Sequence, residues 1–345
     1  MKSVSAIAFW LFACAAAVFL LALVGAVTRL TESGLSIVEW RPVTGALPPL
    51  DAAEWDNAFA LYKASPQYKM VNIGMSLEGF KQIFFWEWLH RLWGRLIGII
   101  YFAPLVYFWM KNRIPAAAKK PLLFILALGF LQGALGWLMV KSGLVDQPAV
   151  SHYRLAAHLL LAAVIFCALF HMGLAFSVRR YPAAEKLSPL RRLLVLSLVL
   201  AGLTMLWGAF VAGLRAGLVY NDSFPLMGKY LWPGEMFSLS PWWTNFFENH
   251  AAVQFVHRAL AALAFLQIFF VVWSSRTFDF PRRLSGLFAA LLAAVCVQAG
   301  LGIAVLLTGV NIIIATLHQA GALALLAVLT ALLYDIPRHA KEKRV

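Results

Sequence analysis

The chain has 345 residues, of which 62% are hydrophobic and only 13% are charged, and its mean hydropathy is +0.78. This composition excludes an ordinary water-soluble enzyme and a disordered chain. The net charge of +14 would suit nucleic acid only on a soluble surface, and too little such surface exists, so we expect no nucleic-acid partner. The three cysteines, Cys14, Cys167 and Cys296, lie in apolar runs and form neither a disulfide framework nor a CxxC metal motif.

Eight apolar runs are long enough to cross a lipid bilayer, since a spanning helix needs about 20 predominantly apolar residues. The first run carries no charge and is followed by more membrane segments, so we interpret it as a retained anchor and not as a signal peptide. Residues 284–334 contain no Asp, Glu, Lys or Arg and predict two helices joined by a tight turn at Thr308-Gly309. Before the second run, Asp51–Lys63 predicts an amphipathic surface helix. The predicted spans are Ile7–Val27, Ile83–Met110, Pro121–Val140, Val150–Val178, Leu193–Gly213, Ala251–Trp273, Leu284–Leu307 and Asn311–Tyr334.

The distribution of Lys and Arg predicts the orientation. The segments on the side of the N-terminus, at residues 2, 111–120, 179–192, 276–283 and 335–344, hold seventeen Lys and Arg against four acidic residues. Cytoplasmic segments retain positive charge, so both termini are expected to be cytoplasmic. The long loops of about residues 28–82 and 214–250 then lie outside. These loops carry the tryptophans expected near an aromatic belt, namely Trp40, Trp55, Trp232, Trp242 and Trp243.

The second half of the sequence repeats the first. The segment LQGALGWLMVKSGL (131–144) aligns with VQAGLGIAVLLTGV (297–310), and WLHR (88–91) aligns with FVHR (255–258) at nearly the same offset. We therefore predict an all-α integral membrane protein built as two repeated four-helix bundles, residues 1–185 and 186–345. Each half is expected to build one site.

Four of the eight histidines, His90, His158, His257 and His318, lie six to eight residues into alternate spans. All four spans start on the outer side, so the imidazoles share a depth of about 10 Å below the outer helix ends. A single membrane histidine is more often a packing residue, but four at one depth in both repeats indicate function. Two imidazoles on facing helices make an axial pair for haem iron. Zinc is disfavoured because no cysteine or third histidine stands at that depth.

Arginines and small residues accompany these histidines. Arg91 and Arg258 directly follow two of them, and Arg154 precedes His158 by four residues. Arginine pairs with carboxylates, so all three are candidate contacts for haem propionates, and snorkelling to lipid headgroups is an equally natural role. Small residues that would let a flat macrocycle approach are Gly94, Gly98, Ala156, Ala157, Ala261, Ala262, Ala320 and Gly321.

Glu87 breaks the symmetry between the halves. It lies three residues before His90, on the same helix face, whereas the second repeat has Gln254 at the matching place. A protein that only moved electrons between two haems would not need a carboxyl group beside one and an amide beside the other. The first half is therefore expected to be the place of chemistry, and an ion pair between Glu87 and a neighbouring arginine is the structural alternative. The roles of the remaining membrane-proximal histidines, His152, His171 and His250, stay open, with packing favoured for the deep His171.

Six segments in combination resemble the haem A synthase family. They are GAVTRLTESGLSIVEWRPVTGALPP, EWLHR, YRLAAHL, GAFVAGLRAGLVYNDSFPLMG, NHAAVQFVHR and LHQAGALALL. The resemblance implies that haem O is the substrate and that a ring methyl is oxidised, through a hydroxymethyl intermediate, to the formyl group of haem A for cytochrome oxidase assembly. It also implies that His90 and His158 hold haem O, that His257 and His318 hold a resident haem b, and that Glu87 matches an essential glutamate. The outer-loop cysteine pair of one branch of the family is absent here.

Two imidazoles on one iron leave no position for oxygen, so either one histidine is released or water supplies the oxygen atom. In the second route, the carboxylate of Glu87 would stabilise positive charge at the methyl carbon and take a proton from water. Electrons then leave to an unidentified electron-transfer partner. Docking to haem O synthase and assembly into a homo-oligomer are left open.

The lack of an Arg-rich presequence favours the cytoplasmic (inner) membrane of a bacterium, with the haem sites near the periplasmic side. A diheme electron carrier of the cytochrome b561 kind is the competing interpretation. It would place one haem near each membrane face, whereas the four histidines here share one face. A transporter with parallel repeats, using the histidines as proton relays, is a second alternative.

Overall fold

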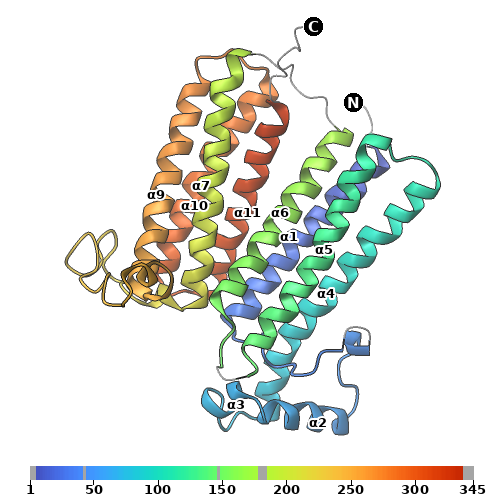
Figure 1. Cartoon of the computed structure of the whole chain (residues 1–345), viewed down its shortest axis with the longest axis vertical. Helices are drawn as coiled ribbons and strands as arrows, with labels where there is room; N and C mark the ends of the chain where they lie inside the picture. The colour runs from blue at the N-terminus through green and yellow to red at the C-terminus, as the bar shows by residue number, and fades with distance from the viewer. Residues whose placement is uncertain (1–4, 42–43, 146–147, 178–184, 337–345) are drawn as a thin grey trace. The chain divides into compact units, whose positions relative to one another are not determined.

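The computed structural model describes residues 5–41, 44–145, 148–177 and 185–336. Within these residues, eight helices are long and apolar enough to cross a membrane (Figure 1), which confirms the predicted number of spans. Parts of the charged segments used for the orientation, residues 1–4, 178–184 and 337–345, lie outside the described residues. The eight helices are α1 (Ala6–Leu30), α4 (Leu77–Met110), α5 (Ala116–Ser142), α6 (His152–Ser177), α7 (Ser188–Gly213), α9 (His250–Ser275), α10 (Arg282–Leu307) and α11 (Ile312–Asp335).

One compact unit comprises residues 16–165. Hydrogen bonds from side chains to backbone carbonyls connect its otherwise apolar helices. The Trp93 indole N–H of α4 donates to the Ala17 carbonyl of α1 at 2.9 Å, and the Tyr101 hydroxyl donates to the Leu122 carbonyl of α5 at 2.7 Å. Because lipid offers no hydrogen bonds, such donors must find partners within the protein, and these bonds fix α4 against α1 and α5.

The other compact unit comprises residues 1–15 and 166–345. Its apolar core draws on α7, α9, α10 and α11 and includes the fully buried Leu194, Ile268, Leu291 and Leu329. Ile268 and Leu329 each follow the histidine of their helix by eleven residues, about 16 Å along the axis. This part of the core thus lies away from the histidines along the helix axes.

The predicted helix at Asp51–Lys63 is present as α2 (Ala52–Lys63), capped by the Asp51 side chain, which accepts from the Glu54 N–H at 2.8 Å. Its apolar face, however, packs on protein. The Phe59 and Tyr62 rings stack on Phe80 at centroid distances of 5.0 and 5.1 Å. This contact explains why α4 starts at Leu77, before the predicted span.

The connections are short helices and tight turns. They include η1 (Thr44–Ala46), α3 (Pro66–Met70), η2 (Glu185–Leu187), η3 (Ala216–Leu218), η4 (Trp242–Thr244) and α8 (Asn245–Glu248). The predicted turn at Thr308-Gly309 is confirmed: Gly309 has a φ of +61°, which glycine adopts without steric cost. The side chain of Asn311 then accepts from the Ile313 and Ile314 N–H groups and caps α11.

Candidate functional site

Three of the four candidate histidines lie at nearly the same distance from the start of their helices. His158, His257 and His318 lie six or seven residues after the first residues of α6, α9 and α11, about 10 Å along each axis. His90 lies thirteen residues into α4, and the part of α4 that packs on α2 accounts for the difference.

Within each unit, the histidines form a pair. His90 and His158 lie near enough to interact electrostatically, and so do His257 and His318. In the described part of the chain, no group of three or more His, Cys, Asp or Glu gathers in a way that would hold a metal ion. Two imidazoles without a third protein ligand suit the axial positions of haem iron and do not suit zinc.

Each imidazole rests its Cε1 edge on a glycine of a neighbouring helix. A Cβ atom added at any of these four glycines would lie only 2.9 to 3.1 Å from Cε1, which is closer than nearly all real contacts of a Cβ atom. Only glycine therefore leaves the rings in their present positions. The pairs are Gly25 with His90, Gly136 with His158, Gly208 with His257, and Gly302 with His318.

The ring nitrogens of His257 are disposed as axial ligation requires. His257 Nδ1 donates to the Thr204 carbonyl oxygen at 2.9 Å, which keeps the proton on Nδ1 and leaves the Nε2 lone pair for a metal. In the other three rings, Nδ1 is buried without a hydrogen-bond partner. His158 Nε2 lies 3.2 Å from the Gln132 amide nitrogen, so it accepts from this amide, and a haem iron would take the place of the Gln132 donor. These residues fit a haem in each unit.

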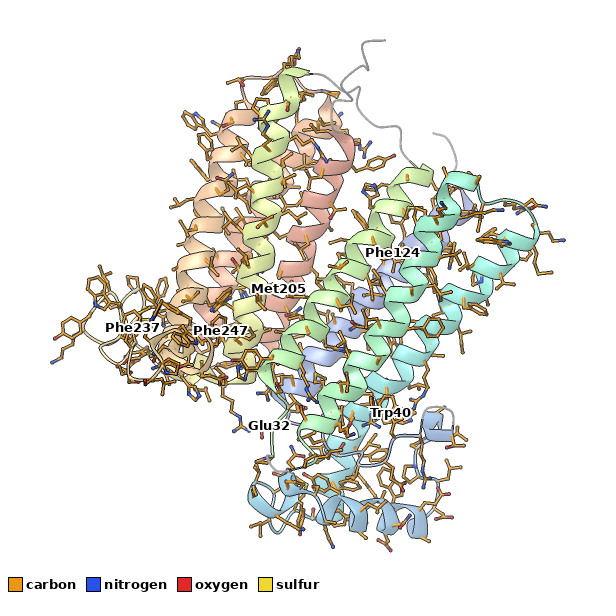
Figure 2. The ribbon with its side chains drawn as sticks, in the orientation of Figure 1. Glu32, Trp40, Phe124, Met205, Phe237 and Phe247 are labelled. Atoms are coloured by element: carbon orange, nitrogen blue, oxygen red, sulfur yellow. The ribbon has the colours of Figure 1, made fainter. Side chains whose placement is uncertain are left out.

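Glu87 is buried, at 3% exposure, and three donors hold its carboxylate. The Ser36 hydroxyl and the Ile37 N–H both donate to Oε2 at 2.7 Å, and Arg91 Nη2 pairs with Oε1 at 2.6 Å. The ion pair anticipated as the structural alternative is thus present. The Arg91 guanidinium also lies 5.3 Å from the centroid of the Trp40 ring, which is labelled in Figure 2. A carboxylate has about four acceptor positions, so one remains, on Oε1.

Gln254 is equally buried, at 2% exposure, but hydrogen-bond acceptors surround its amide nitrogen. Its amide nitrogen donates to the carbonyl oxygens of Ala216 at 2.9 Å and Val219 at 2.5 Å. The amide therefore meets acceptors where the carboxylate of Glu87 meets donors.

The three candidate arginines bind backbone carbonyls. Arg91 donates to the Ile37 carbonyl at 2.9 Å, and Arg258 donates to the Tyr220 carbonyl at 2.8 Å. Arg154 is exposed and donates to a carbonyl of α5. A guanidinium has five N–H donors, so these bonds leave others for propionates, and that role stays a prediction.

The remaining membrane-proximal histidines lie apart from these pairs. The His171 ring makes an edge contact with Tyr334 at 5.3 Å, as a packing residue would. The His152 ring lies 4.0 Å from that of Tyr153 at the start of α6. His250 begins α9 and is exposed.

The four glycines under the histidines were missed by sequence reasoning, which chose small residues on the helices of the histidines themselves. At one of those, Gly98, an added Cβ would meet nothing within 4 Å. The repeat carried a usable signal, since Gly136 aligns with Gly302, and Gly25 and Gly208 begin the similar segments GAVTRLTESGL and GAFVAGLRAGL. Ser36 was missed as well, because only the folded loop brings it to Glu87.

Known proteins match almost the entire chain. A sequence model of the cytochrome oxidase assembly protein family, COX15-CtaA, matches residues 8–330. The haem A synthase of Rhodospirillum centenum is 49% identical over 343 residues, which cover 97% of this chain and 91% of that protein. The haem A synthase of Nitrosospira multiformis is 50% identical over 325 residues, 92% of this chain and 90% of that protein. That of Parvibaculum lavamentivorans is 46% identical over 323 residues, 94% and 92% of the two chains. Since the family model matches residues 8–330 and these relatives are 46–50% identical over more than 90% of the chain, the chain belongs to the COX15-CtaA family of cytochrome oxidase assembly proteins.

Proposed function

We propose that the chain is an oxidoreductase that converts haem O to haem A for cytochrome oxidase assembly. A ring methyl of haem O is oxidised to a hydroxymethyl group and then to a formyl group. Similarity to haem A synthases supports this function. The structural observation that carries it is the buried carboxylate of Glu87 one turn from His90, with the uncharged Gln254 in the matching place beside His257.

The two halves have different tasks in this proposal. Residues 1–185 hold the substrate haem O between His90 and His158, and residues 186–345 hold haem b as a cofactor between His257 and His318. The position of the carboxylate supports this assignment, because oxidation of a methyl group develops positive charge that a nearby carboxylate stabilises.

A parallel repeat of a four-helix bundle accounts for the matched loops of the two halves. Glu32 and Arg215 hold matching places after α1 and α7 and have φ values of 56° and 54°, a conformation that is uncommon outside glycine. Further along the same loops, the carbonyls of Ile37 and Tyr220 each accept from the arginine that follows a histidine. The Lys and Arg distribution supports cytoplasmic termini and histidines near the periplasmic side of a bacterial inner membrane.

In the first half, Glu87 is the residue that accepts a proton during the oxidation of the methyl group. Bound haem iron supplies electron transfer. Arg91, Ser36 and Ile37 hold the Glu87 carboxylate and leave one acceptor position on Oε1. Oxidation of the methyl group to hydroxymethyl breaks one C–H bond and removes its proton and two electrons, while the oxygen of a water bonds to the carbon and Oε1 takes a proton of that water. A second two-electron oxidation, with loss of two protons, gives the formyl group. The electrons leave to a partner protein, and haem O synthase is the source of the substrate.

Pigment extraction from the purified protein tests the function. Expression with ample porphyrin in a host that makes haem O is expected to give haem b together with haem O or haem A. Haem b as the sole pigment would support a diheme electron carrier instead, and a colourless protein would support a transporter.

A further inference from the structure

The two halves bring the same pair of positions into contact, one on the loop after the first helix and one on the next histidine-bearing helix. In the first half these are Ser36 and Glu87, and in the second they are Val219 and Gln254, which match them in the internal repeat. The Ser36 hydroxyl donates to Glu87 Oε2 at 2.7 Å, whereas Gln254 Nε2 donates to the Val219 carbonyl at 2.5 Å. The Ser36–Glu87 contact can therefore be compared with the Val219–Gln254 contact of the same chain, in which an amide replaces the carboxylate.

The two loops differ in whether they supply hydrogen-bond donors or acceptors. In the first half, the Ser36 hydroxyl and the Ile37 N–H supply two donors to one carboxylate oxygen. In the second half, the loop supplies carbonyl acceptors to an amide, and the Val219 side chain has no hydroxyl to donate. A buried carboxylate requires donors and a buried amide nitrogen requires acceptors, so the serine belongs with the glutamate.

We infer that Ser36 is a positioning residue for the oxidation of haem O, and that its hydroxyl holds the Glu87 carboxylate in the orientation that acts on the substrate. This inference rests on the proposed function. Arg91 holds Oε1, but the orientation of Oε2 depends on Ser36 and Ile37. Ser36 is 1% exposed, so bulk water does not readily replace the hydroxyl, and hydrogen bonds to a charged group are the strong ones.

The alternative is that Ser36 only packs the loop against α4. Its hydroxyl also lies 3.4 Å from the Ile83 carbonyl, a longer contact to an uncharged acceptor. A packing role would not require a hydroxyl, as Val219 illustrates at the matching place. The two roles therefore differ in what a hydroxyl-preserving substitution does.

The test uses the full chain, purified with its haems from a bacterium that makes haem O and haem b. Ser36→Ala removes the hydroxyl, Ser36→Thr keeps it, and Val219→Ala is the matched control in the other half. Ser36→Ala is expected to retain both haems and to convert haem O about tenfold more slowly, the effect of losing a hydrogen bond to a charged group. Ser36→Thr is expected to stay within about twofold of the unaltered protein on the same grounds, and Val219→Ala to leave conversion unchanged.

A second readout does not depend on activity. The infrared carboxylate band of Glu87, identified as the band lost in Glu87→Gln, is expected to shift in Ser36→Ala and to return in Ser36→Thr. Unchanged conversion and an unchanged band in Ser36→Ala would overturn the inference, as would equal impairment of Ser36→Ala and Ser36→Thr, or loss of haem O from Ser36→Ala. A wild-type preparation with neither haem O nor haem A would instead overturn the proposed function, and the infrared band would still report on the Ser36–Glu87 contact.

Discussion

Glu87 and Gln254 differ by a single atom of the side-chain terminus, yet each is matched to its own loop. In Glu87→Gln, the amide nitrogen would face either Arg91 Nη2 or the Ser36 and Ile37 donors, so donors would oppose each other. We expect both haems to remain bound and conversion of haem O to fall by a factor on the order of 10² or more, as for loss of a general base. The ratio of haem O to haem A in extracts measures this, after absorption spectra have shown that both sites are occupied. Normal formation of haem A in that variant would contradict the role of Glu87.

The glycines under the histidines lead to a prediction that is specific to one half. Gly208→Ala places a Cβ atom 3.0 Å from Cε1 of His257, so the ring must shift from its position. We expect the affinity for haem b to fall about tenfold or more, as for other disturbances behind a metal ligand, while haem O binding is retained. Gly202→Ala on the same helix is the control, because its Cβ meets nothing within 4 Å. Equal haem b contents in the two variants would show that the glycine does not position the ring.

A pH effect is expected in the loop after α7. The hydrogen bond of the Tyr220 hydroxyl to Glu235, together with partial burial and the charge of Glu235, raises the pKa of Tyr220 from 10.0 to about 12. A raised pKa means that the fold favours the neutral phenol. The contribution of this hydrogen bond to the free energy of unfolding is therefore fully present below the ordinary pKa of tyrosine and is lost as the pH rises from about 10 towards 12. Tyrosinate absorbance of the protein minus that of Tyr220→Phe measures the pKa, and titration near the ordinary value would refute the contact.

At the scale of the helices, α2 is predicted to depend on α4 for its stability. Phe59→Ala removes the ring that stacks on Phe80, and loss of a buried phenylalanine costs about 3–5 kcal/mol. Hydrogen exchange in residues 52–63 is expected to accelerate strongly while the spans stay protected. Asn57→Ala, on the exposed face of α2, is the control. Equal protection of the two variants would mean that α2 is held by something other than this contact.

The spans were predictable because their apolar length is a property of one continuous segment. The pairing of the histidines was predictable as well, since their spacing from the starts of the predicted apolar runs repeats along the chain. The start of α4 was not, because Leu77 lies outside the apolar run and is ordered by contact with α2. The contacts of Gly25 with His90 and of Ser36 with Glu87 join segments that are distant in the sequence, so only packing of the backbone brings them together.

At the scale of the whole molecule, most of the net charge of +14 belongs to the segments that the proposed orientation places on the cytoplasmic side, as the retention of positive charge by cytoplasmic segments predicts. Two units with the same histidine and glycine arrangement hold a haem each in this account. Among their differences is one buried pair, Ser36 and Glu87 against Val219 and Gln254. Under the proposed function, this pair distinguishes the substrate site from the cofactor site.

The haem content of histidine variants tests the central claim most directly. His257→Ala is expected to lose haem b and keep haem O, and His158→Ala is expected to keep haem b and lose haem O, as measured by extraction and separation of the pigments from purified protein. Loss of both haems in either folded variant, or of neither in both, would contradict the assignment of one histidine pair to each haem.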